Sequence, residues 1–188
     1  QLLEQRLDKN TLRREDFRLV RDEVDRMNQL LSDLLAFQQG RPPQMKLQRI
    51  YPHLERCVEL TQPQAEKRGV QLVFQANEPE VEAPVDARQF TQVMMNLILN
   101  AIEAATEPGR IRIGMHSNPN HVAVEVTDEG PGLTVDQQEH LFEAFYTTKA
   151  HGVGLGLAVS RELVQSMGGQ LYYKPGRAGA TFVVELPR

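Results

Sequence analysis

Three polar residues that could bind a metal ion recur on one predicted helix. Apolar residues follow helical spacing from 86 to 106, and Asn96, Asn100 and Glu103 fall beside that apolar stripe. Residues spaced four and three apart project from the same face of a helix, so their oxygens can converge on one site. Each asparagine costs about 0.6 kcal/mol of helix propensity relative to alanine. Two of them in mid-helix indicate a role for the amides, although solvated polar residues would give the same pattern.

An acidic, glycine-rich turn follows a predicted strand. The segment Asp128-Glu-Gly130-Pro-Gly132 comes directly after apolar alternation that ends near Val126. A carboxylate there can accept a hydrogen bond from an exocyclic amine such as that of adenine, and glycines let the backbone approach a planar ligand closely. The same residues also suit an ordinary surface turn, so this segment alone leaves both interpretations open.

A third segment places Gly152, Gly154 and Gly156 directly before an amphipathic helix. The free N–H groups at a helix start, together with the positive end of the helix dipole, suit phosphate oxygens. The spacing does not match a dinucleotide fingerprint, because Leu157 stands where that motif needs glycine. The Walker sequence Gly-Lys-Ser/Thr does not occur either. A glycine run by itself remains a weak indication of phosphate binding.

In this order, the segments resemble the ATP-binding domain of histidine kinases, within the superfamily that includes gyrase, the heat-shock chaperone ATPases and MutL. The matching segments are Asn96-Leu-Ile-Leu-Asn100-Ala101 (N box), Asp128-x-Gly130-x-Gly132 (G1 box), Leu141-Phe-Glu-Ala-Phe-Tyr-Thr-Thr-Lys149 (F box), Gly152-x-Gly154-x-Gly156 (G2 box) and Gly179-Ala-Thr181-Phe182 (final glycine motif). The resemblance covers residues 15 to 188. The short lid from Tyr146 to His151 and the Asn-Ala-Ile-Glu-Ala sequence are most similar to the nitrogen-regulation type of sensor kinase.

The resemblance implies a site for ATP and Mg²⁺. Asn100 would bind Mg²⁺ through its amide oxygen, with Asn96 supporting it and Glu103 nearby. Asp128 would accept a hydrogen bond from the adenine amino group, and Lys149 would face the triphosphate unless it is a solvated loop lysine. Asn96, Asn100 and Lys149 are thus the implied catalytic residues. The other residues implied in nucleotide binding are Gly130, Gly132, Phe145, Thr147, Thr148, Gly152, Val153, Gly154, Leu155, Gly156 and Thr181.

The implied activity is that of an ATP-dependent protein-histidine kinase. The γ-phosphoryl group would pass to a histidine on a dimerisation hairpin, and from there to an aspartate in the receiver domain of a response regulator. The full-length protein would be a homodimer. Family acceptors lie in a His-Glu/Asp-x-x-Asn/Thr-Pro box, and none of the five histidines has that context: His53, His116, His121, His140 and His151. We therefore expect this chain to bind Mg·ATP without phosphorylating itself.

Two other functions are compatible with parts of the pattern. One is a serine kinase or ATPase of the same superfamily, and the predicted helical hairpin argues against it. The other is a nucleotide-binding or dimerisation module without catalysis. Intact Asn100, Asp128 and lid glycines argue against that second possibility.

The elements that must position these residues form a mixed domain. Helices are predicted over 50–68, 86–106 and 154–167, and strands over 70–75, 82–84, 110–117, 121–127, 170–174 and 180–186. The Asn118-Pro-Asn120 turn joins two strands as a hairpin, so the sheet is partly antiparallel and not doubly wound. With the resemblance, this predicts an α+β two-layer sandwich over 49–188, a Bergerat-type ATP-binding fold whose mixed sheet is covered by three helices.

A helical hairpin is predicted before this domain. From Phe17 to Leu34 apolar residues recur at alternating spacings of three and four, as in a coiled-coil seam. We expect residues 1–40 to be the C-terminal part of a dimerisation hairpin that lacks its acceptor histidine. Gly40, Pro42 and Pro43 end the helix, and residues 41–48 are predicted to be a linker.

Composition excludes some partners. The chain has 188 residues and a net charge of -4, so it has no basic excess for nucleic acid or an anionic membrane. Its single cysteine, Cys57, is expected to be a buried apolar residue and suits a reducing compartment. No stretch reaches the roughly 18 apolar residues of a spanning helix. We expect a cytoplasmic fragment of a longer protein, located in the cytoplasm or at the cytoplasmic side of the inner membrane.

Overall fold

The computed structural model describes residues 20, 24, 42–149, 152–176 and 179–188. The chain divides into two compact units, Gln1–Gly40 and Arg41–Arg188, and every element below belongs to the second. The hairpin predicted for residues 1–40 lies outside the described residues, apart from Val20 and Val24, which are both helical. Across the described part of the chain, no helix combines the length and the apolar character needed to cross a membrane.

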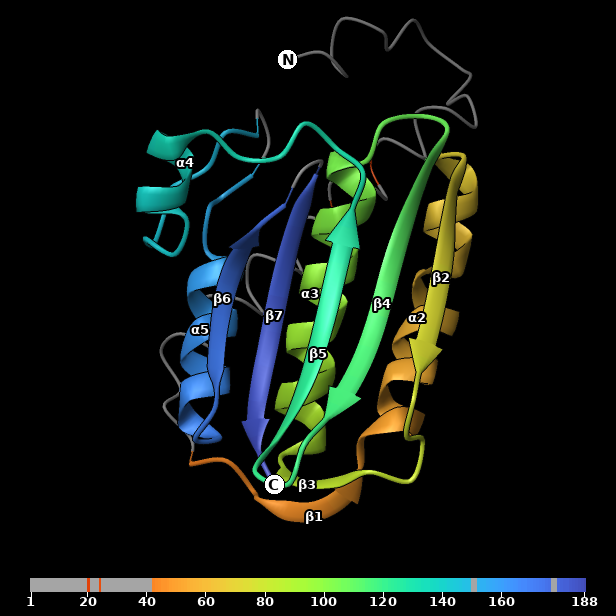
Figure 1. Ribbon diagram of the computed structural model, residues 1–188. Helices are drawn as coiled ribbons and strands as arrows, with labels where there is room; N and C mark the ends of the chain where they lie inside the picture. Colours follow the sequence, from red (N-terminus) through yellow and green to blue (C-terminus); the bar gives the residue numbers. More distant parts are fainter. Residues whose placement is uncertain (1–19, 21–23, 25–41, 150–151, 177–178) are drawn as a thin grey trace, which may run out of the picture. The chain divides into compact units, whose positions relative to one another are not determined.

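The domain is built on a five-stranded sheet with the strand order β2-β4-β5-β7-β6 (Figure 1). The strands are β2 Val70–Ala76, β4 Gly109–Ser117, β5 His121–Asp128, β6 Gln170–Pro175 and β7 Ala180–Pro187. β2 runs parallel to β4, and every other neighbouring pair is antiparallel. The predicted mixed sheet is therefore confirmed, including the hairpin at Asn118-Pro-Asn120.

A small second sheet pairs β1 Lys46–Arg49 antiparallel with β3 Glu82–Val85. The sequence predicted β3 but not β1, and residues 46–48 belong to the segment predicted as a linker. Their strand conformation arises from pairing with a distant part of the chain, which local composition does not report.

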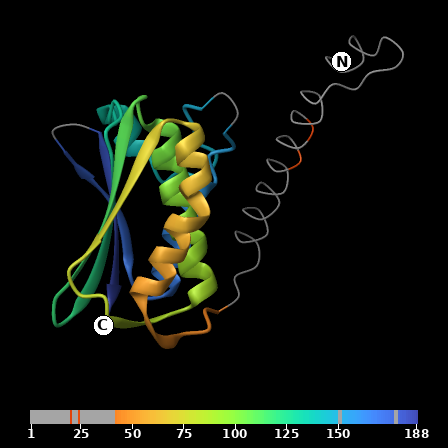
Figure 2. The same ribbon diagram turned by 90° about the vertical axis from the view of Figure 1, so that its right-hand side faces the viewer.

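The long helices of the domain pack on one face of the large sheet, and Figure 2 shows the helix layer to one side of the sheet. They are α2 Ile50–Lys67, α3 Ala87–Ala104 and α5 Gly156–Ser166. A fourth helix, α4 Val135–His140, has only six residues and none of them is buried. Without an apolar face it left no periodic signal in the sequence. The two-layer α+β sandwich covered by three helices is confirmed.

The core lies between the sheet and the helices. Alternate residues of β4 are buried, namely Ile111, Ile113 and Met115, and they face the helix layer that includes Phe90 and Leu97 of α3. Cys57 on α2 is buried in the same core, and burial raises the pKa of its thiol to about 11. The neutral thiol therefore packs as a small apolar side chain, as expected.

Helix α3 begins at a well-defined cap. The Asp86 carboxylate accepts hydrogen bonds from the backbone N–H groups of Arg88 and Gln89, at 3.0 and 3.1 Å, and from that of Gln44 at 2.8 Å. Partial burial opposes ionisation of Asp86, but these backbone bonds hold its pKa below the ordinary value. The cap satisfies N–H groups that the helix cannot pair internally, and it fixes where the α3 register begins.

Packing of α2 on the core gives a first test. Leu54 is completely buried whereas Leu60, on the same helix, is 48% exposed. Leu54→Ala is expected to lower the free energy of unfolding by about 2–5 kcal/mol, because it leaves a cavity in the core. The matched Leu60→Ala is expected to change it by less than about 0.5 kcal/mol. Urea denaturation measures both, and equal effects would contradict the placement of α2.

Candidate functional site

The last turns of α3 carry the three polar residues that the sequence placed on one helical face. Asn96 and Asn100 are half-buried, and the Asn100 side-chain nitrogen donates a hydrogen bond of 3.3 Å to Asn96 Oδ1. The Asn96 side-chain nitrogen donates in turn to the Ser160 hydroxyl on α5, at 2.9 Å. Asn96 is therefore held at both ends and orients its neighbour, which leaves Oδ1 of Asn100 for a different partner.

Lys149 is that partner. Its ammonium group donates to Asn100 Oδ1 at 2.7 Å and also pairs with the Glu103 carboxylate. A single cation thus lies between an amide oxygen and a carboxylate oxygen. Hard oxygen ligands of this kind suit Mg²⁺, which usually completes its shell with phosphate oxygens and water. The donor set therefore fits a magnesium ion that arrives with a nucleotide.

A metal site made only of protein carboxylates, histidines and cysteines is not part of this arrangement. Within the residues that the structure describes, no group of three or more such side chains could hold a metal ion. A magnesium ion at Asn100 and Glu103 would depend on ligands from outside the protein. Metal binding and nucleotide binding would therefore be coupled.

Asp128 ends β5 and is almost completely buried, with 2% of its surface exposed. Its Oδ1 accepts hydrogen bonds from the backbone N–H groups of Gly130, at 2.8 Å, and Ala180, at 3.1 Å. Because both bonds use the same oxygen, Oδ2 is available as an acceptor. A buried acceptor of this kind would select strongly for a ligand that brings a hydrogen-bond donor.

The turn after Asp128 lies against the end of α3. A Cβ atom at Gly130 would come within 2.5 Å of the Ala104 carbonyl oxygen, so only glycine allows this approach. The Thr106 hydroxyl also donates to the Glu129 carbonyl oxygen at 3.4 Å. Ala104 directly follows Glu103, so the acidic turn and the cation-binding oxygens are brought to the same end of α3. Figure 1 places the ends of α3 and β5 at the same end of the sheet.

Two further predicted positions lie beside Asp128. Thr181 of β7 stands opposite Thr127 in the sheet, and their hydroxyl groups share a hydrogen bond of 3.0 Å. Gly132 approaches Gly179, because a Cβ at Gly132 would lie 3.0 Å from the Gly179 carbonyl oxygen. The final glycine motif and the acidic turn therefore form one connected surface.

The lid segment folds back on itself before α5. The Phe145 N–H donates to the Gly154 carbonyl oxygen at 2.9 Å, and the Gly152 N–H donates to the Lys149 carbonyl oxygen at 3.2 Å. The Thr147 hydroxyl accepts from the Lys149 N–H at 3.1 Å. This folded segment presents the Lys149 side chain to α3. Residues 150 and 151 lie outside the described residues.

The other predicted lid residues differ in what they can offer a ligand. Phe145 is 65% exposed, and Thr148 is also exposed. Leu155 is only 3% exposed, so its side chain belongs to the core and only its backbone could meet a nucleotide. The Val153 side chain is half-buried. The structure therefore ties Lys149 directly to α3, whereas these four side chains make no hydrogen bond among the described residues.

The start of α5 is close to α3. A Cβ atom at Gly156 would lie 2.6 Å from Asn96 Oδ1, so this glycine permits the two helices to meet at the amide cluster. Among the described residues, no side chain caps the start of α5, so its first N–H groups have no side-chain acceptor there. Anions bind readily at such an N-terminus.

Sequence reasoning missed two residues that support the site. Ser160 is buried and bonds Asn96, and Thr127 bonds Thr181 beside Asp128. Both could have been found. Ser160 is a polar residue one helical turn after Gly156 on an otherwise apolar face, and Thr127 directly precedes the acidic turn.

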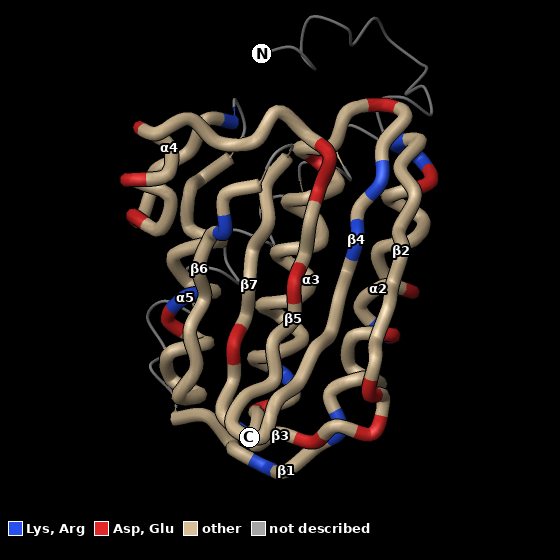
Figure 3. The backbone as a smooth tube through the Cα atoms, viewed as in Figure 1, with Lys and Arg blue, Asp and Glu red and all other residues tan. Residues whose placement is uncertain are grey.

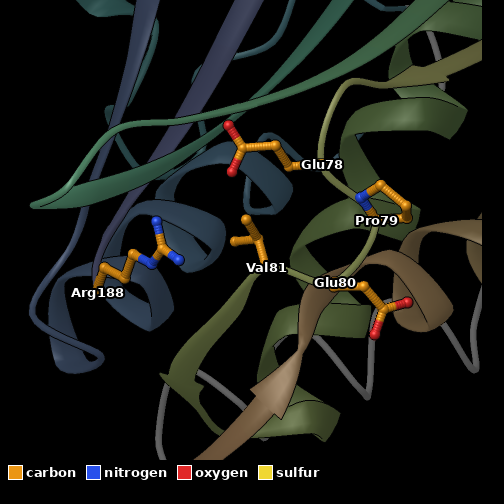
Figure 4. A pocket seen from close by; sticks show the side chains of 5 residues that line it. All are labelled: Glu78, Pro79, Glu80, Val81 and Arg188. Carbon is orange, nitrogen blue, oxygen red and sulfur yellow. The ribbon is translucent and has the colours of Figure 1, made fainter.

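A surface pocket of about 310 Å³ lies elsewhere, lined by Glu78, Pro79, Glu80, Val81 and Arg188 (Figure 4). Arg188 follows β7, whereas Ala180 at the start of β7 contacts Asp128. The pocket is therefore at the far end of the sheet from the polar cluster, and it contains none of the residues that the sequence singled out.

Charges on the sheet are mixed in sign. Figure 3 shows basic residues on β4 and β6 beside acidic residues on β5 and β7. Several form ion pairs, such as Lys174 with Glu125 at 3.2 Å and Arg112 with Glu129 at 3.2 Å. Opposite charges therefore neighbour each other on these strands.

Comparisons with known proteins identify the family and the fold. Residues 85–188 match the family model described as histidine kinase-, DNA gyrase B-, and HSP90-like ATPase. The sensor histidine kinase ZraS of Escherichia coli strain K12 is 37% identical over 169 residues, which cover 88% of this chain and 36% of that protein. The chain thus spans about a third of the length of the curated relatives it matches.

Solved structures show the same fold. The catalytic domain of the histidine kinase ThkA has a TM-score of 0.72 and 28% identity, covering 77% of this chain and 95% of that chain. Full-length ShkA, solved in complex with AMPPNP, has a TM-score of 0.79 and 27% identity, covering 96% of this chain and 40% of that chain.

Because Asp128 Oδ1 accepts two backbone hydrogen bonds, its loss is expected to destabilise the fold. Asp128→Ala is expected to lower the free energy of unfolding by about 1–3 kcal/mol, because the N–H groups of Gly130 and Ala180 lose their acceptor. Asp128→Asn keeps an acceptor oxygen and is expected to cost less. Thermal and urea unfolding compare the two. Equal stability of Asp128→Ala and wild type would show that the turn does not depend on this carboxylate.

Proposed function

The protein belongs to the family of histidine kinase-, DNA gyrase B-, and HSP90-like ATPases, and on that premise we propose that it is the ATP-binding catalytic part of a sensor histidine kinase. The single observation that carries the proposal is the meeting of three groups at the end of α3. The Asn100 and Glu103 oxygens bind the Lys149 ammonium group there. The turn that follows the buried Asp128 packs against Ala104, the residue after Glu103. A nucleotide needs these groups together: an acceptor for the base and oxygens for the metal.

Adenine would bind at the acidic turn. Oδ2 of Asp128 would accept a hydrogen bond from the exocyclic amine, while Oδ1 stays with its two backbone donors. Guanine has a carbonyl oxygen at the corresponding position, and two acceptors facing each other would leave a buried carboxylate unsatisfied. The site would therefore discriminate between the two purines. Gly130 and Gly132 leave the backbone close enough to face the base.

The phosphates would bind between α3 and α5. Asn100 would hold Mg²⁺ through Oδ1, with Asn96 orienting its amide and Glu103 beside it. Bound magnesium would neutralise charge on the transferred phosphoryl group. The backbone N–H groups near Gly152, Gly154 and Gly156 would meet phosphate oxygens, and Lys149 would add a positive charge. Phe145, Thr147, Thr148, Val153 and Thr181 would line the rest of the nucleotide site, together with the backbone of Leu155.

The proposed reaction is phosphoryl transfer to a histidine ring. The bond between the γ-phosphorus and the ADP oxygen breaks, and a bond forms between that phosphorus and an imidazole nitrogen. This chemistry needs positioning and charge neutralisation more than covalent participation by the protein. The resemblance to ZraS and ThkA, both histidine kinases by name, supports histidine over serine as acceptor.

The wider setting follows from the same proposal. In the full-length protein, residues 1–40 would belong to a dimerisation hairpin, 41–48 would connect it and 49–188 would be the catalytic domain. The acceptor histidine of a homodimer would pass its phosphoryl group to the receiver domain of a response regulator in the cytoplasm. Assignment to the nitrogen-regulation subgroup stays a prediction from the lid and N-box sequences.

Nucleotide selectivity tests the base site. Asp128→Asn is expected to weaken ATP binding by about tenfold to a hundredfold, because an amide nitrogen would replace the free acceptor. The matched control is Glu129→Gln, which changes the adjacent carboxylate of the same turn and should leave affinity within about twofold. Calorimetry with Mg·ATP and Mg·GTP measures both. Wild-type affinity in Asp128→Asn, or equal binding of the two nucleotides by the unaltered chain, would refute this placement of the base.

Labelled ATP tests the acceptor. With γ-³²P-ATP and Mg²⁺, the 188-residue chain is expected to retain no acid-labile, alkali-stable phosphate, because its histidines lack the acceptor motif. A polypeptide extended upstream to include the acceptor helix is expected to become labelled. Label on one of the present histidines would contradict the proposal. Acid-stable label on the extended polypeptide would instead favour a serine kinase of the same superfamily.

A further inference from the structure

The contact of Lys149 with α3 has a consequence for which form of the nucleotide can bind. Lys149 lies 46 residues from Glu103 and 49 from Asn100, and its ammonium group binds both side chains at once. The Lys149 and Glu103 side chains are 43% and 41% exposed, so the pair lies where a ligand can reach it. The positive charge of this contact therefore occupies the position that the proposed function gives to the metal.

Among the described residues, Asn96 and Ser160 support Asn100, and both are neutral. Oδ1 of Asp128 accepts hydrogen bonds from the backbone N–H groups of Gly130 and Ala180. The Glu129 carboxylate forms an ion pair with Arg112. Glu103 is thus the carboxylate that a polyphosphate would meet next to Asn100, and Lys149 is the charge that balances it.

A metal-free nucleotide and a metal-loaded one meet this pair differently. Metal-free ATP could attract Lys149 to its phosphates, but that movement would leave the Glu103 carboxylate without a counter-charge and close to phosphate oxygens. Two anions so placed repel each other. With the metal-loaded nucleotide, a cation again stands beside Asn100 and Glu103, so Lys149 can move to the phosphates while Glu103 remains paired.

We propose that Glu103 makes the site select the magnesium-loaded nucleotide over the metal-free one, and that Lys149 partly offsets this selection by supplying a positive charge to a nucleotide that brings no metal. This inference rests on the proposed nucleotide site and adds a specificity role to it. Glu103 penalises an incoming polyphosphate that brings no metal, and Lys149 holds the metal position until a metal-loaded nucleotide replaces it. The two residues therefore have opposite effects on the benefit that magnesium brings to binding.

The test measures AMPPNP affinity by calorimetry, once with excess Mg²⁺ and once with EDTA. The ratio of the two dissociation constants gives the magnesium benefit for each variant. Glu103→Gln removes the carboxylate charge while keeping its size, and Lys149→Met removes the ammonium while keeping the length of the stem. The matched control is Lys174→Met, which breaks a lysine–carboxylate pair with Glu125 on the sheet.

Opposite shifts are expected. Glu103→Gln should tighten metal-free AMPPNP binding by about threefold or more and lower the magnesium benefit by at least as much. Lys149→Met should weaken metal-free binding and raise the magnesium benefit by about threefold or more. Lys174→Met should leave the benefit unchanged. All of these substitutions are at exposed side chains, and matching circular dichroism spectra check that the variants remain folded.

Loss of nucleotide binding and loss of magnesium selectivity are distinguishable results. If the unaltered chain binds neither form of AMPPNP, the proposed nucleotide site is wrong and this inference falls with it. If the unaltered chain binds AMPPNP but the magnesium benefit is the same in all variants, or shifts in the same direction in Glu103→Gln and Lys149→Met, only the selectivity role is overturned.

Discussion

Helix α3 has to be buried along one side and carry hydrogen-bonding groups along another, and the rest of the site depends on that division. Its apolar side, which includes Phe90, Leu97 and Ile98, packs on the sheet. The neighbouring positions Asn96 and Asn100 stay half-buried, where an amide can be oriented by packing and still reach a ligand. Because a helix repeats every 3.6 residues, one register fixes both sides together.

Close approach to α3 then brings distant segments to the same place. Glycine at 156 lets the start of α5 reach Asn96, and glycine at 130 lets the acidic turn reach Ala104. Both contacts depend on the absence of a side chain at a glycine, which lets the backbone of a distant segment approach α3 closely. The Lys149 contact is the exception, since it joins two exposed side chains and can break without disturbing the core.

Much of this was accessible from the sequence, for physical reasons that differ between elements. The long helices and the buried strands have strong periodicity, so their positions were predicted to within a few residues, and the mixed sheet followed from the Asn118-Pro-Asn120 hairpin. Strand β1 and helix α4 were missed. β1 depends on pairing with distant β3, and α4 is an exposed single turn and a half held by the Thr134 and Gln137 capping box.

The candidate site residues were chosen by type and spacing, and those criteria gave no prediction of their contacts. Spacing placed Asn96 and Asn100 on one face, yet it gave no reason to expect that Ser160 would hold one of them or that Lys149 would bridge to Glu103. Those contacts join residues about 46 to 64 positions apart, which only the tertiary fold decides. The second backbone donor to Asp128, from Ala180, was hidden for the same reason.

The central claim is that the end of α3, the Asp128 turn and the start of α5 receive one nucleotide together. Nuclear magnetic resonance of the ¹⁵N-labelled chain during titration with Mg·AMPPNP tests it most directly. The account predicts that the side-chain amide of Asn100 and the backbone amides of Gly130 and Gly156 shift along a single binding curve, while Val81 in the distant pocket does not move. Separate curves for these groups, or shifts confined to the neighbours of Val81, would contradict it.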